Sequence, residues 1–145
     1  MTGMGALALA AVLVVTVLAS WWLRTRNGAL RTVDEPSGTA QAVLRRLGAT
    51  PEAAALTIVQ FSTAFCAPCR ATKARLEQLQ ASRPDLAVVH VDAESHLDEV
   101  RELDVRRTPT LFYLDRDGRL IGRSSGAPAP AELTALVDAH AGVRE

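Results

Sequence analysis

Phe65-Cys66-Ala67-Pro68-Cys69-Arg70 contains both cysteines of this 145-residue chain and decides its fold. The apolar run Leu56 to Phe61 before it is typical of a strand, and residues 71–81 after it place Leu76 and Leu79 on one side of a helix. Two residues between the cysteines let both sulfurs meet across one helical turn. A strand, a Cys-x-x-Cys and a helix in this order predict a redox-active pair. Cys66 then lies at a helix N-terminus, where unpaired N–H groups favour a thiolate.

Two other uses of a cysteine pair fit this sequence less well. A four-ligand zinc site needs two further soft ligands, but there are only two cysteines, and His90, His96 and His140 are widely scattered. A purely structural disulfide across so short a loop would remove little chain entropy. We therefore expect no metal site and no cofactor, and we predict that Cys66 and Cys69 are the catalytic pair.

The first 23 residues carry no charge, and the sixteen basic and sixteen acidic residues that follow cancel. A balanced charge gives no field that would attract nucleic acid. Residues 2–23 are apolar, and at about 1.5 Å per residue they span roughly 33 Å, enough for the hydrocarbon core of a bilayer. Trp21 and Trp22 end this run where an interfacial aromatic belt would lie. We therefore predict one transmembrane anchor at 2–23.

A cleaved signal peptide is the alternative to an anchor, since Val17-Leu18-Ala19 resembles a small-residue cleavage site. Against cleavage stand the missing basic n-region and the length of the apolar run. No Lys or Arg precedes the run, whereas Arg24, Arg26 and Arg31 follow it closely. The positive-inside rule then places the C-terminal part of a single-pass protein on the cytoplasmic face of the membrane.

Residues 24–36 form a short polar segment that contains Gly28 and Pro36, which is typical of a linker. Residues 29–33 within it could instead add an edge strand to the sheet, and the sequence leaves this open. Residues 37–145 have the length of one compact domain. We therefore predict an anchor at 2–23, a linker at 24–36 and a domain at 37–145.

The pattern inside this domain predicts alternating helices and strands. Ser37 or Thr39 would cap a helix that ends at Gly48, and Ser95 would cap a short helix. The other predicted elements are strands at 86–91, 110–114 and 119–123, with a turn at 115–118 between the last two, and a helix at 131–141. This order predicts an α/β fold with a mixed central sheet flanked by helices.

The domain resembles thioredoxin over its full length. The matching pieces are Val59-Gln60-Phe61, Cys66-Ala67-Pro68-Cys69, Val91-Asp92, Arg107-Thr108-Pro109-Thr110, the Asp117-Gly118 turn and Gly126. The resemblance implies a thioredoxin-like fold and exchange with protein disulfides and dithiols, with Cys66 as the nucleophile and Cys69 as the resolving thiol. It also implies a cis peptide bond before Pro109, next to the cysteines. The residues expected to shape the substrate site are Phe65, Ala67, Pro68, Thr108, Pro109 and Gly126.

Several positions depart from the thioredoxin pattern. The usual Trp before the first cysteine is Phe65, the usual Gly after it is Ala67, and the usual Ile before the cis-proline is Thr108. The buried Asp that commonly relays a proton to the second thiol is Gln60, and the Lys usually opposite it is His90. Gln60 cannot ionise, so His90 is either a proton shuttle acting through water or a packed strand histidine. These departures favour a specialised membrane-tethered relative over a general-purpose thioredoxin.

The sequence as a whole predicts a membrane-tethered thiol–disulfide oxidoreductase that reduces protein disulfides. Its electrons would come from a thioredoxin-reductase-like or membrane donor. One alternative is a non-catalytic redox sensor or scaffold. Another is an extracytoplasmic disulfide oxidase or isomerase, since many membrane-tethered relatives of thioredoxin work outside the cytoplasm. The intact cysteine pair, with a proline between the thiols, favours catalysis.

Overall fold

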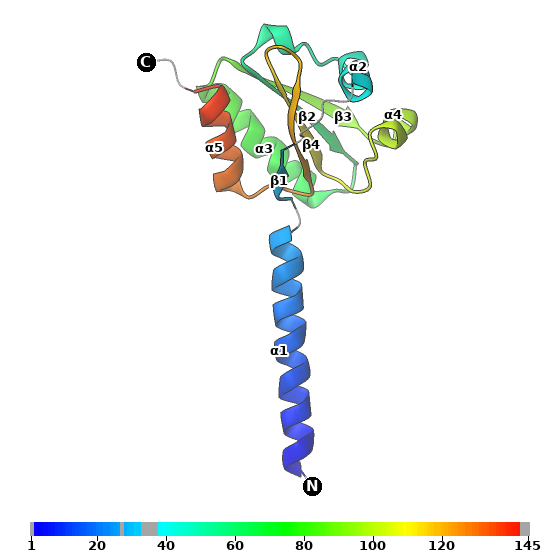
Figure 1. Ribbon diagram of the computed structural model, residues 1–145, viewed down its shortest axis with the longest axis vertical. Coiled ribbons are helices and arrows are strands. Elements are labelled where there is room, and N and C mark those ends of the chain that lie inside the picture. Colours follow the sequence, from blue (N-terminus) through cyan, green and yellow to red (C-terminus); the bar gives the residue numbers. More distant parts are fainter. Residues whose placement is uncertain (1, 27, 33–37, 143–145) are drawn as a thin grey trace.

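A computed structural model of the chain describes residues 2–26, 28–32 and 38–142, and its centre is one five-stranded sheet (Figure 1). The strand order is β1-β5-β4-β2-β3. β2 and β3 run parallel, and every other neighbouring pair is antiparallel. The strands are β1 (Leu30–Arg31), β2 (Leu56–Ser62), β3 (Leu86–Asp92), β4 (Thr110–Asp115) and β5 (Leu120–Ser125). The predicted mixed sheet is therefore confirmed.

Helices cover both faces of this sheet (Figure 1). α2 (Gly38–Arg46) and α4 (Leu97–Glu102) lie on one face, while α3 (Ala67–Ser82) and α5 (Pro130–His140) lie on the other. A short 3-10 helix, η1 (Pro51–Ala53), leads from α2 to β2. This layering confirms the predicted α/β fold, because a sheet with two apolar faces has to be covered twice.

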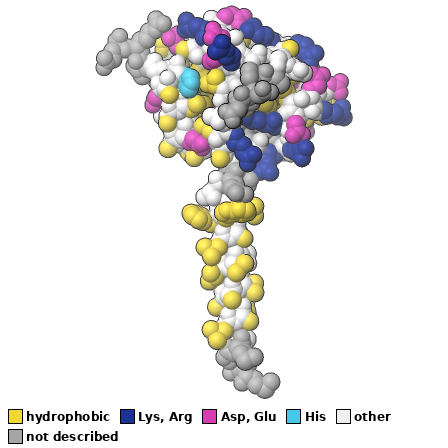
Figure 2. Space-filling model, in the orientation of Figure 1, with side chains coloured by type: hydrophobic (Ala, Val, Ile, Leu, Met, Phe, Trp, Pro, Cys, Tyr) yellow, Lys and Arg dark blue, Asp and Glu magenta, His cyan; other side chains and the backbone are white. Residues whose placement is uncertain are grey.

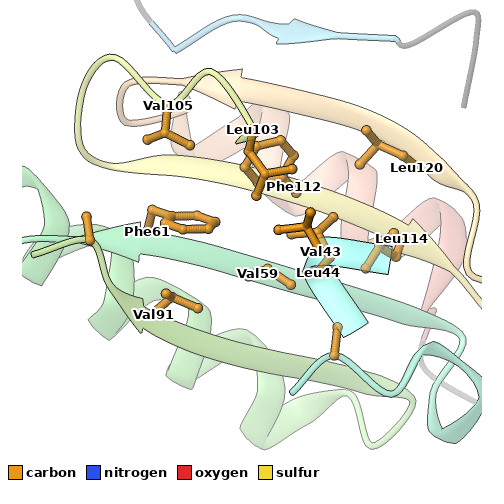
Figure 3. Packing of buried hydrophobic residues seen from close by; sticks show 12 residues of the cluster. Val43, Leu44, Val59, Phe61, Val91, Leu103, Val105, Phe112, Leu114 and Leu120 are labelled. Carbon is orange, nitrogen blue, oxygen red and sulfur yellow. The ribbon is translucent and has the colours of Figure 1, made fainter. Parts of the chain in front are cut away.

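The two core clusters follow from the alternation of side chains along the strands. In β4, Phe112 and Leu114 join the cluster under α2 and α4, whereas Leu111 and Tyr113 join the one under α3 and α5. Phe61 of β2 meets Phe112 edge to face, with ring centroids 5.7 Å apart (Figure 3). Each such side chain, fully buried, contributes about 1.5–3 kcal/mol. β2 and β4 are buried on both faces, and their sequences are accordingly mostly apolar.

Most turns lie where the sequence predicts them. The first helix of the domain ends before Gly48, whose φ of 97° ends the helix in the left-handed region. The hairpin turn closes through an N–H donated by Gly118 to the carbonyl of Asp115 over 3.0 Å. The prediction that Ser95 caps α4 is wrong. The Ser95 hydroxyl donates to Asp92 instead, over 2.6 Å, and α4 begins one residue later, after His96.

Of the possible edge strand at residues 29–33, Leu30 and Arg31 form β1, and residue 33 lies outside the described residues. Leu30 and Arg31 pair with Ser124 and Arg123 of β5. The Leu30 N–H also donates to the Glu132 carboxylate in the first turn of α5, over 2.9 Å. The segment 24–36, predicted as a linker, therefore contains a strand of the domain's own sheet.

The N-terminal helix α1 (Thr2–Arg26) extends from the domain as a separate rod (Figure 1). Its stretch Gly5–Leu23 is long and apolar enough to cross a membrane. All described side chains of that stretch are exposed, and they are hydrophobic or small (Figure 2). An exposed apolar rod needs an apolar surrounding, which is the expected state of an anchor or of a signal sequence.

Candidate active site

The two cysteines lie where β2 passes into α3. The backbone after Ser62 makes a tight turn, closed by the Cys66 N–H, which donates to the Thr63 carbonyl over 3.4 Å. α3 begins directly after Cys66, at Ala67, with Pro68 in its first turn. Proline suits that position, because the first N–H groups of a helix have no partner within the helix.

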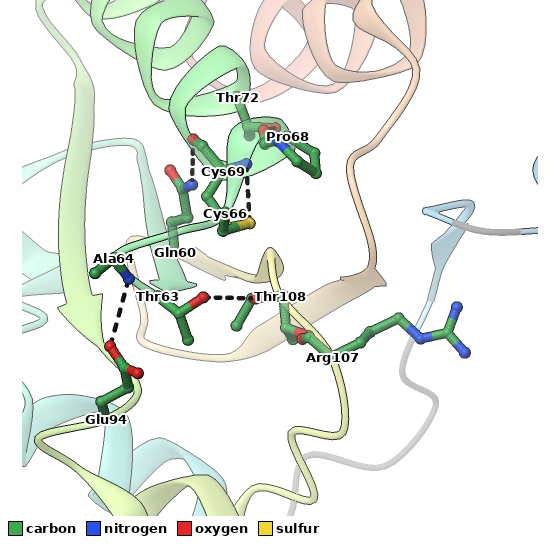
Figure 4. Close-up of a disulfide and its surroundings, with 11 residues drawn as sticks. Gln60, Thr63, Ala64, Cys66, Pro68, Cys69, Thr72, Glu94, Arg107 and Thr108 are labelled. Atoms are coloured by element: carbon green, nitrogen blue, oxygen red, sulfur yellow. Dashed lines mark hydrogen bonds between the residues drawn. A yellow bond between two sulfur atoms is a disulfide. The ribbon is translucent and has the colours of Figure 1, made fainter.

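Cys66 caps the N-terminus of α3 with its own sulfur. The Cys69 N–H donates to the Cys66 Sγ over 3.2 Å (Figure 4). Such a donor, together with the positive end of the helix dipole, stabilises negative charge on this sulfur. The sequence-based expectation for the surroundings of Cys66 is therefore met in the geometry.

The structure holds the pair as a Cys66–Cys69 disulfide with the two Cα atoms 5.2 Å apart. Cys66 is 9% exposed and Cys69 is 3% exposed. Cys66 is the more exposed of the two cysteines, as expected, although its exposed fraction is smaller than the sequence led us to expect. Phe65, next to it, is 98% exposed. An incoming sulfur therefore meets Cys66 before Cys69, beside an unpacked aromatic ring.

The loop before β4 lies opposite the cysteines. The Thr108–Pro109 peptide bond is cis, as the resemblance implies. The hydroxyls of Thr63 and Thr108 are 3.3 Å apart and link this loop to the turn before Cys66 (Figure 4). The Gly126 N–H donates to the Pro109 carbonyl over 2.7 Å. Three chain segments that are distant in sequence therefore form one wall around the disulfide.

Gln60 lies behind the disulfide, buried to 1% exposure on β2. Its Nε2 donates to the Cys69 carbonyl over 3.0 Å, so it holds the backbone of α3 (Figure 4). Its Oε1 is buried without a hydrogen-bond partner. The position directly behind Cys69 therefore carries an amide and no ionisable group.

His90 pairs in register with Gln60 but lies on the edge strand β3, with its side chain exposed. The pKa of His90 is lowered, first by partial desolvation and then by the nearby positive charge of Lys73 on α3, while Glu77 acts in the opposite direction. No hydrogen bond joins His90 to Gln60 or to either cysteine, all of which belong to the described part of the chain. The structure therefore brings Gln60 to the cysteines but leaves His90 at the sheet edge.

Two residues near the disulfide were not predicted from the sequence. Thr63 bonds to Thr108 across 45 positions of sequence, and Glu94 accepts a hydrogen bond from the Ala64 N–H over 3.4 Å (Figure 4). Glu94 follows the end of β3 by two positions, and this placement was the only signal for it, since β3 is parallel to β2 and ends at the same edge. Thr63 had no comparable signal.

This arrangement can carry out thiol–disulfide exchange. It offers one sulfur at a helix N-terminus, on the more exposed of the two cysteines, a second sulfur bonded to it, and no third cysteine in the chain. Within the described residues, no group of three or more His, Cys, Asp or Glu side chains is placed to hold a metal ion.

Comparisons with known proteins agree with this geometry. The family model described as Thioredoxin matches residues 49–139. The mitochondrial thioredoxin-3 of Saccharomyces cerevisiae is 34% identical over 70 residues, 48% of this chain and 54% of that protein. The thioredoxin of Chlamydia trachomatis is 31% identical over 88 residues, 61% of this chain and 85% of that protein. Thioredoxin-2 of Pyricularia oryzae is 34% identical, and the match covers 47% of that protein. The chain therefore covers about half the length of the Saccharomyces and Pyricularia proteins.

Solved structures show the same fold. The crystal structure of oxidized mitochondrial thioredoxin 3 from Saccharomyces cerevisiae superposes with a TM-score of 0.56 at 26% identity, covering 66% of this chain and 89% of that one. Thioredoxin f2 of Chlamydomonas reinhardtii superposes with a TM-score of 0.57 at 24% identity, covering 66% and 87%. With the family pattern extending over more than half of its length, from before β2 to the end of α5, this chain belongs to the thioredoxin family.

Proposed function

We propose that this chain is a membrane-tethered thiol–disulfide oxidoreductase that reduces protein disulfides. The observation that carries the proposal is the hydrogen bond from the Cys69 N–H to the Cys66 sulfur at the start of α3. It gives the more exposed of two linked sulfurs the surroundings of a thiolate nucleophile. A sensor or scaffold would not require this arrangement.

The exchange begins from the reduced pair. The Cys66 thiolate attacks one sulfur of a substrate disulfide, that S–S bond breaks, and the departing thiolate takes a proton from solvent. Cys69 then loses its proton and attacks the Cys66 Sγ. The mixed disulfide breaks, the second substrate thiolate leaves and is protonated, and the Cys66–Cys69 disulfide forms. Two electrons pass to the substrate, so each turnover needs a donor of the thioredoxin-reductase class or a membrane electron donor to reduce the pair again.

The surrounding residues receive roles from their positions. Phe65 presents an exposed ring to the substrate, while Ala67 and Pro68 form the exposed first turn of α3 beside it. Thr108, Pro109 and Gly126 form the opposite wall, held by the bonds described above. An extended substrate segment would lie between these walls, with its sulfur at Cys66.

Gln60 acts in this proposal as a positioning residue, because it holds the Cys69 carbonyl but has no proton to exchange. The proton of Cys69 therefore has no carboxylate at position 60 to receive it. His90 is neutral at neutral pH, given its lowered pKa, and can take up a proton only through intervening water.

The direct test separates the roles of the two thiols. Cys69→Ser, in its reduced form, should accumulate a mixed disulfide with a disulfide-bonded substrate such as intact insulin, and Cys66→Ser, the matched control, should accumulate none. The wild-type chain should reduce insulin with dithiothreitol as the electron source. Trapping through Cys69 in the Cys66→Ser variant would contradict the assignment.

The direction of exchange is tested by the reduction potential of the pair against glutathione. A value near −270 mV, as in thioredoxin, supports a reductant, and a value near −120 mV supports an oxidant.

The side of the membrane on which the domain lies is tested separately. We place the domain on the cytoplasmic face, because Arg24, Arg26 and Arg31 follow the span closely. Alkaline phosphatase fused after Glu145 should then be inactive, and high activity would place the domain outside.

A further inference from the structure

The chain enters the domain against the segment that follows β5. The Gly28 N–H donates to the Ser125 carbonyl over 2.9 Å. A Cβ atom at Gly28 would lie 2.0 Å from the Ala127 carbonyl oxygen, so the backbones at these two positions are in direct contact. The first residue described after α1 is therefore held against residues 125–127.

Residues 125–128 are also part of the active-site wall. Gly126 bonds to the Pro109 carbonyl, and Ala127 and Pro128 line, together with Pro68, a cavity of about 250 Å³. This one segment therefore lies between Gly28 and the cysteine pair. The picture agrees, since the N-terminal end of α3 lies at the end of the domain from which α1 leaves (Figure 1).

The connection to the apolar span is short. Gly28 follows Leu23, the last residue of the candidate span, by five positions, and the chain is helical as far as Arg26. Even fully extended, five residues reach at most about 18 Å. Because only Asn27 separates the end of α1 from Gly28, the end of the domain that Gly28 contacts stays near the bilayer while the opposite end points away.

Positive charge gathers at the same end. A cavity of about 450 Å³ is lined by Arg31, Arg106, Arg107 and Arg123, with Asp104 as the one acidic side chain among its lining residues. Arg107 directly precedes Thr108, and its side chain extends from the active-site loop toward β1 (Figure 4). Lys and Arg side chains gather on the visible part of the domain nearest α1 (Figure 2). Arg106 is paired with Asp104, and the Arg123 guanidinium donates to the carbonyls of Leu103 and Asp104, but the group keeps a net positive charge. An anionic lipid surface attracts such a group.

We propose that the substrates are membrane proteins whose disulfides lie next to the bilayer surface, because the short tether and the arginines hold Cys66 facing that surface. This inference rests on the proposed reductase function. The exchange is the one described above, in which the membrane protein's disulfide gains two electrons and the Cys66–Cys69 disulfide forms. A disulfide far from the membrane is reached only when the domain turns over on its tether.

The experiment compares two designed reporters in vesicles of phosphatidylcholine with a minor fraction of phosphatidylglycerol. Each reporter is a single apolar helix followed by a small disulfide-closed loop. In the near reporter the loop follows the helix directly, and in the far reporter a long flexible Gly/Ser spacer precedes it. The reduced full chain is reconstituted with either reporter on the same face, and the appearance of reporter thiols is followed. We expect the near reporter to react about tenfold faster, as expected when a tether sets the effective concentration.

A lengthened tether supplies the matched control. A flexible Gly/Ser insert of about 20 residues between Arg26 and Asn27 adds a mean reach of roughly 25 Å, and it should remove the preference for the near reporter. The same insert added after Glu145 should leave the preference unchanged. Soluble insulin in the same vesicles should be reduced at similar rates by all three chains.

The outcomes separate the two proposals. Equal rates on the near and far reporters, or a preference that survives the insert at Arg26, overturn the substrate class while insulin reduction leaves the reductase function standing. Loss of insulin reduction by the unmodified chain overturns the reductase function itself. A near preference that disappears only with the insert after Arg26 supports the inference.

Discussion

Gln60 is the residue at which this chain departs most from its family, and its burial makes the departure measurable. The side chain sits at 1% exposure with Nε2 bonded to the Cys69 carbonyl and Oε1 without a partner. In the described part of the chain, no Lys or Arg side chain donates a hydrogen bond to this oxygen. A buried carboxyl without a cation stays protonated to higher pH, because burial disfavours the charged form.

We expect Gln60→Asp to lose stability as the pH rises from about 4 to about 8, relative to Gln60→Asn. The pKa of the new carboxyl is higher in the folded state than in the unfolded state. The free energy of unfolding therefore falls as the pH rises from the unfolded-state pKa to the folded-state pKa. By pH 8 the loss should reach about 1–3 kcal/mol. Urea unfolding of the oxidised proteins at several pH values measures it. Parallel pH curves for the Asp and Asn variants would contradict the expectation.

His90 changes the stability with pH in the opposite direction. Its pKa is lowered in the folded state, so the unfolded chain takes up the proton first as the pH falls. Stability present above about pH 6.5 is then lost as the pH falls toward the lower folded-state pKa. His90→Asn should flatten the stability curve between about pH 7 and pH 5. An unchanged slope would mean that His90 is solvated alike in both states. Insulin turnover of the same variant tests any part in proton transfer.

At the scale of elements, the pattern of apolar residues was sufficient to predict most strands and helices. The buried strands β2 and β4 have near-continuous apolar sequences, and the turns at Gly48 and Gly118 carry glycines in the left-handed region. The helix after the cysteines begins at Ala67, so that Cys66 lies at its N-terminus as the sequence predicts. Its first turn holds Pro68, which is compatible with a helix only at this end.

The two-residue strand β1 could not be decided from the sequence. Leu30 and Arg31 are too few to show an alternation, and their pairing with β5 depends on contacts made more than ninety positions away. The Thr63–Thr108 contact was invisible for the same reason. Sequence patterns report local periodicity, whereas these contacts depend on how distant segments meet.

The junction between α1 and the sheet gives a prediction at this scale. Gly28 has a φ of 85°, and a Cβ there would lie 2.0 Å from the Ala127 carbonyl oxygen. Gly28→Ala should therefore cost about 1–3 kcal/mol, through the left-handed backbone and the displaced Ala127 segment. Gly38→Ala, with nothing within 4 Å of its Cβ and a place at the start of α2, is the control. It should be neutral or stabilise by up to about 1 kcal/mol. Equal unfolding free energies for the two variants would contradict the reading of this junction.

At the scale of the whole molecule, β1 joins the segment that follows α1 to the sheet of the domain. A chain shortened to begin at Gly28 keeps the pairing with β5 and the bond from Leu30 to Glu132, and a chain beginning at Gly38 loses both. We expect the longer fragment to unfold at a temperature higher by about 4–8 °C for each kcal/mol that these contacts supply. Thermal unfolding followed by circular dichroism measures the difference. Identical midpoints would show that the edge strand adds no stability.

The tryptophans of the chain are both in α1, at positions 21 and 22, and its one tyrosine, Tyr113, lies fully buried in the domain. The two halves of the molecule therefore carry separate optical labels. Tryptophan emission therefore reports the polarity around the end of α1, without a signal from the domain. Quenching by lipids brominated along the acyl chain measures how deep this end of the helix lies in the bilayer. Opening and closing of the disulfide, by contrast, has no tryptophan beside it to change in brightness, so the redox state of this protein has to be followed by thiol labelling.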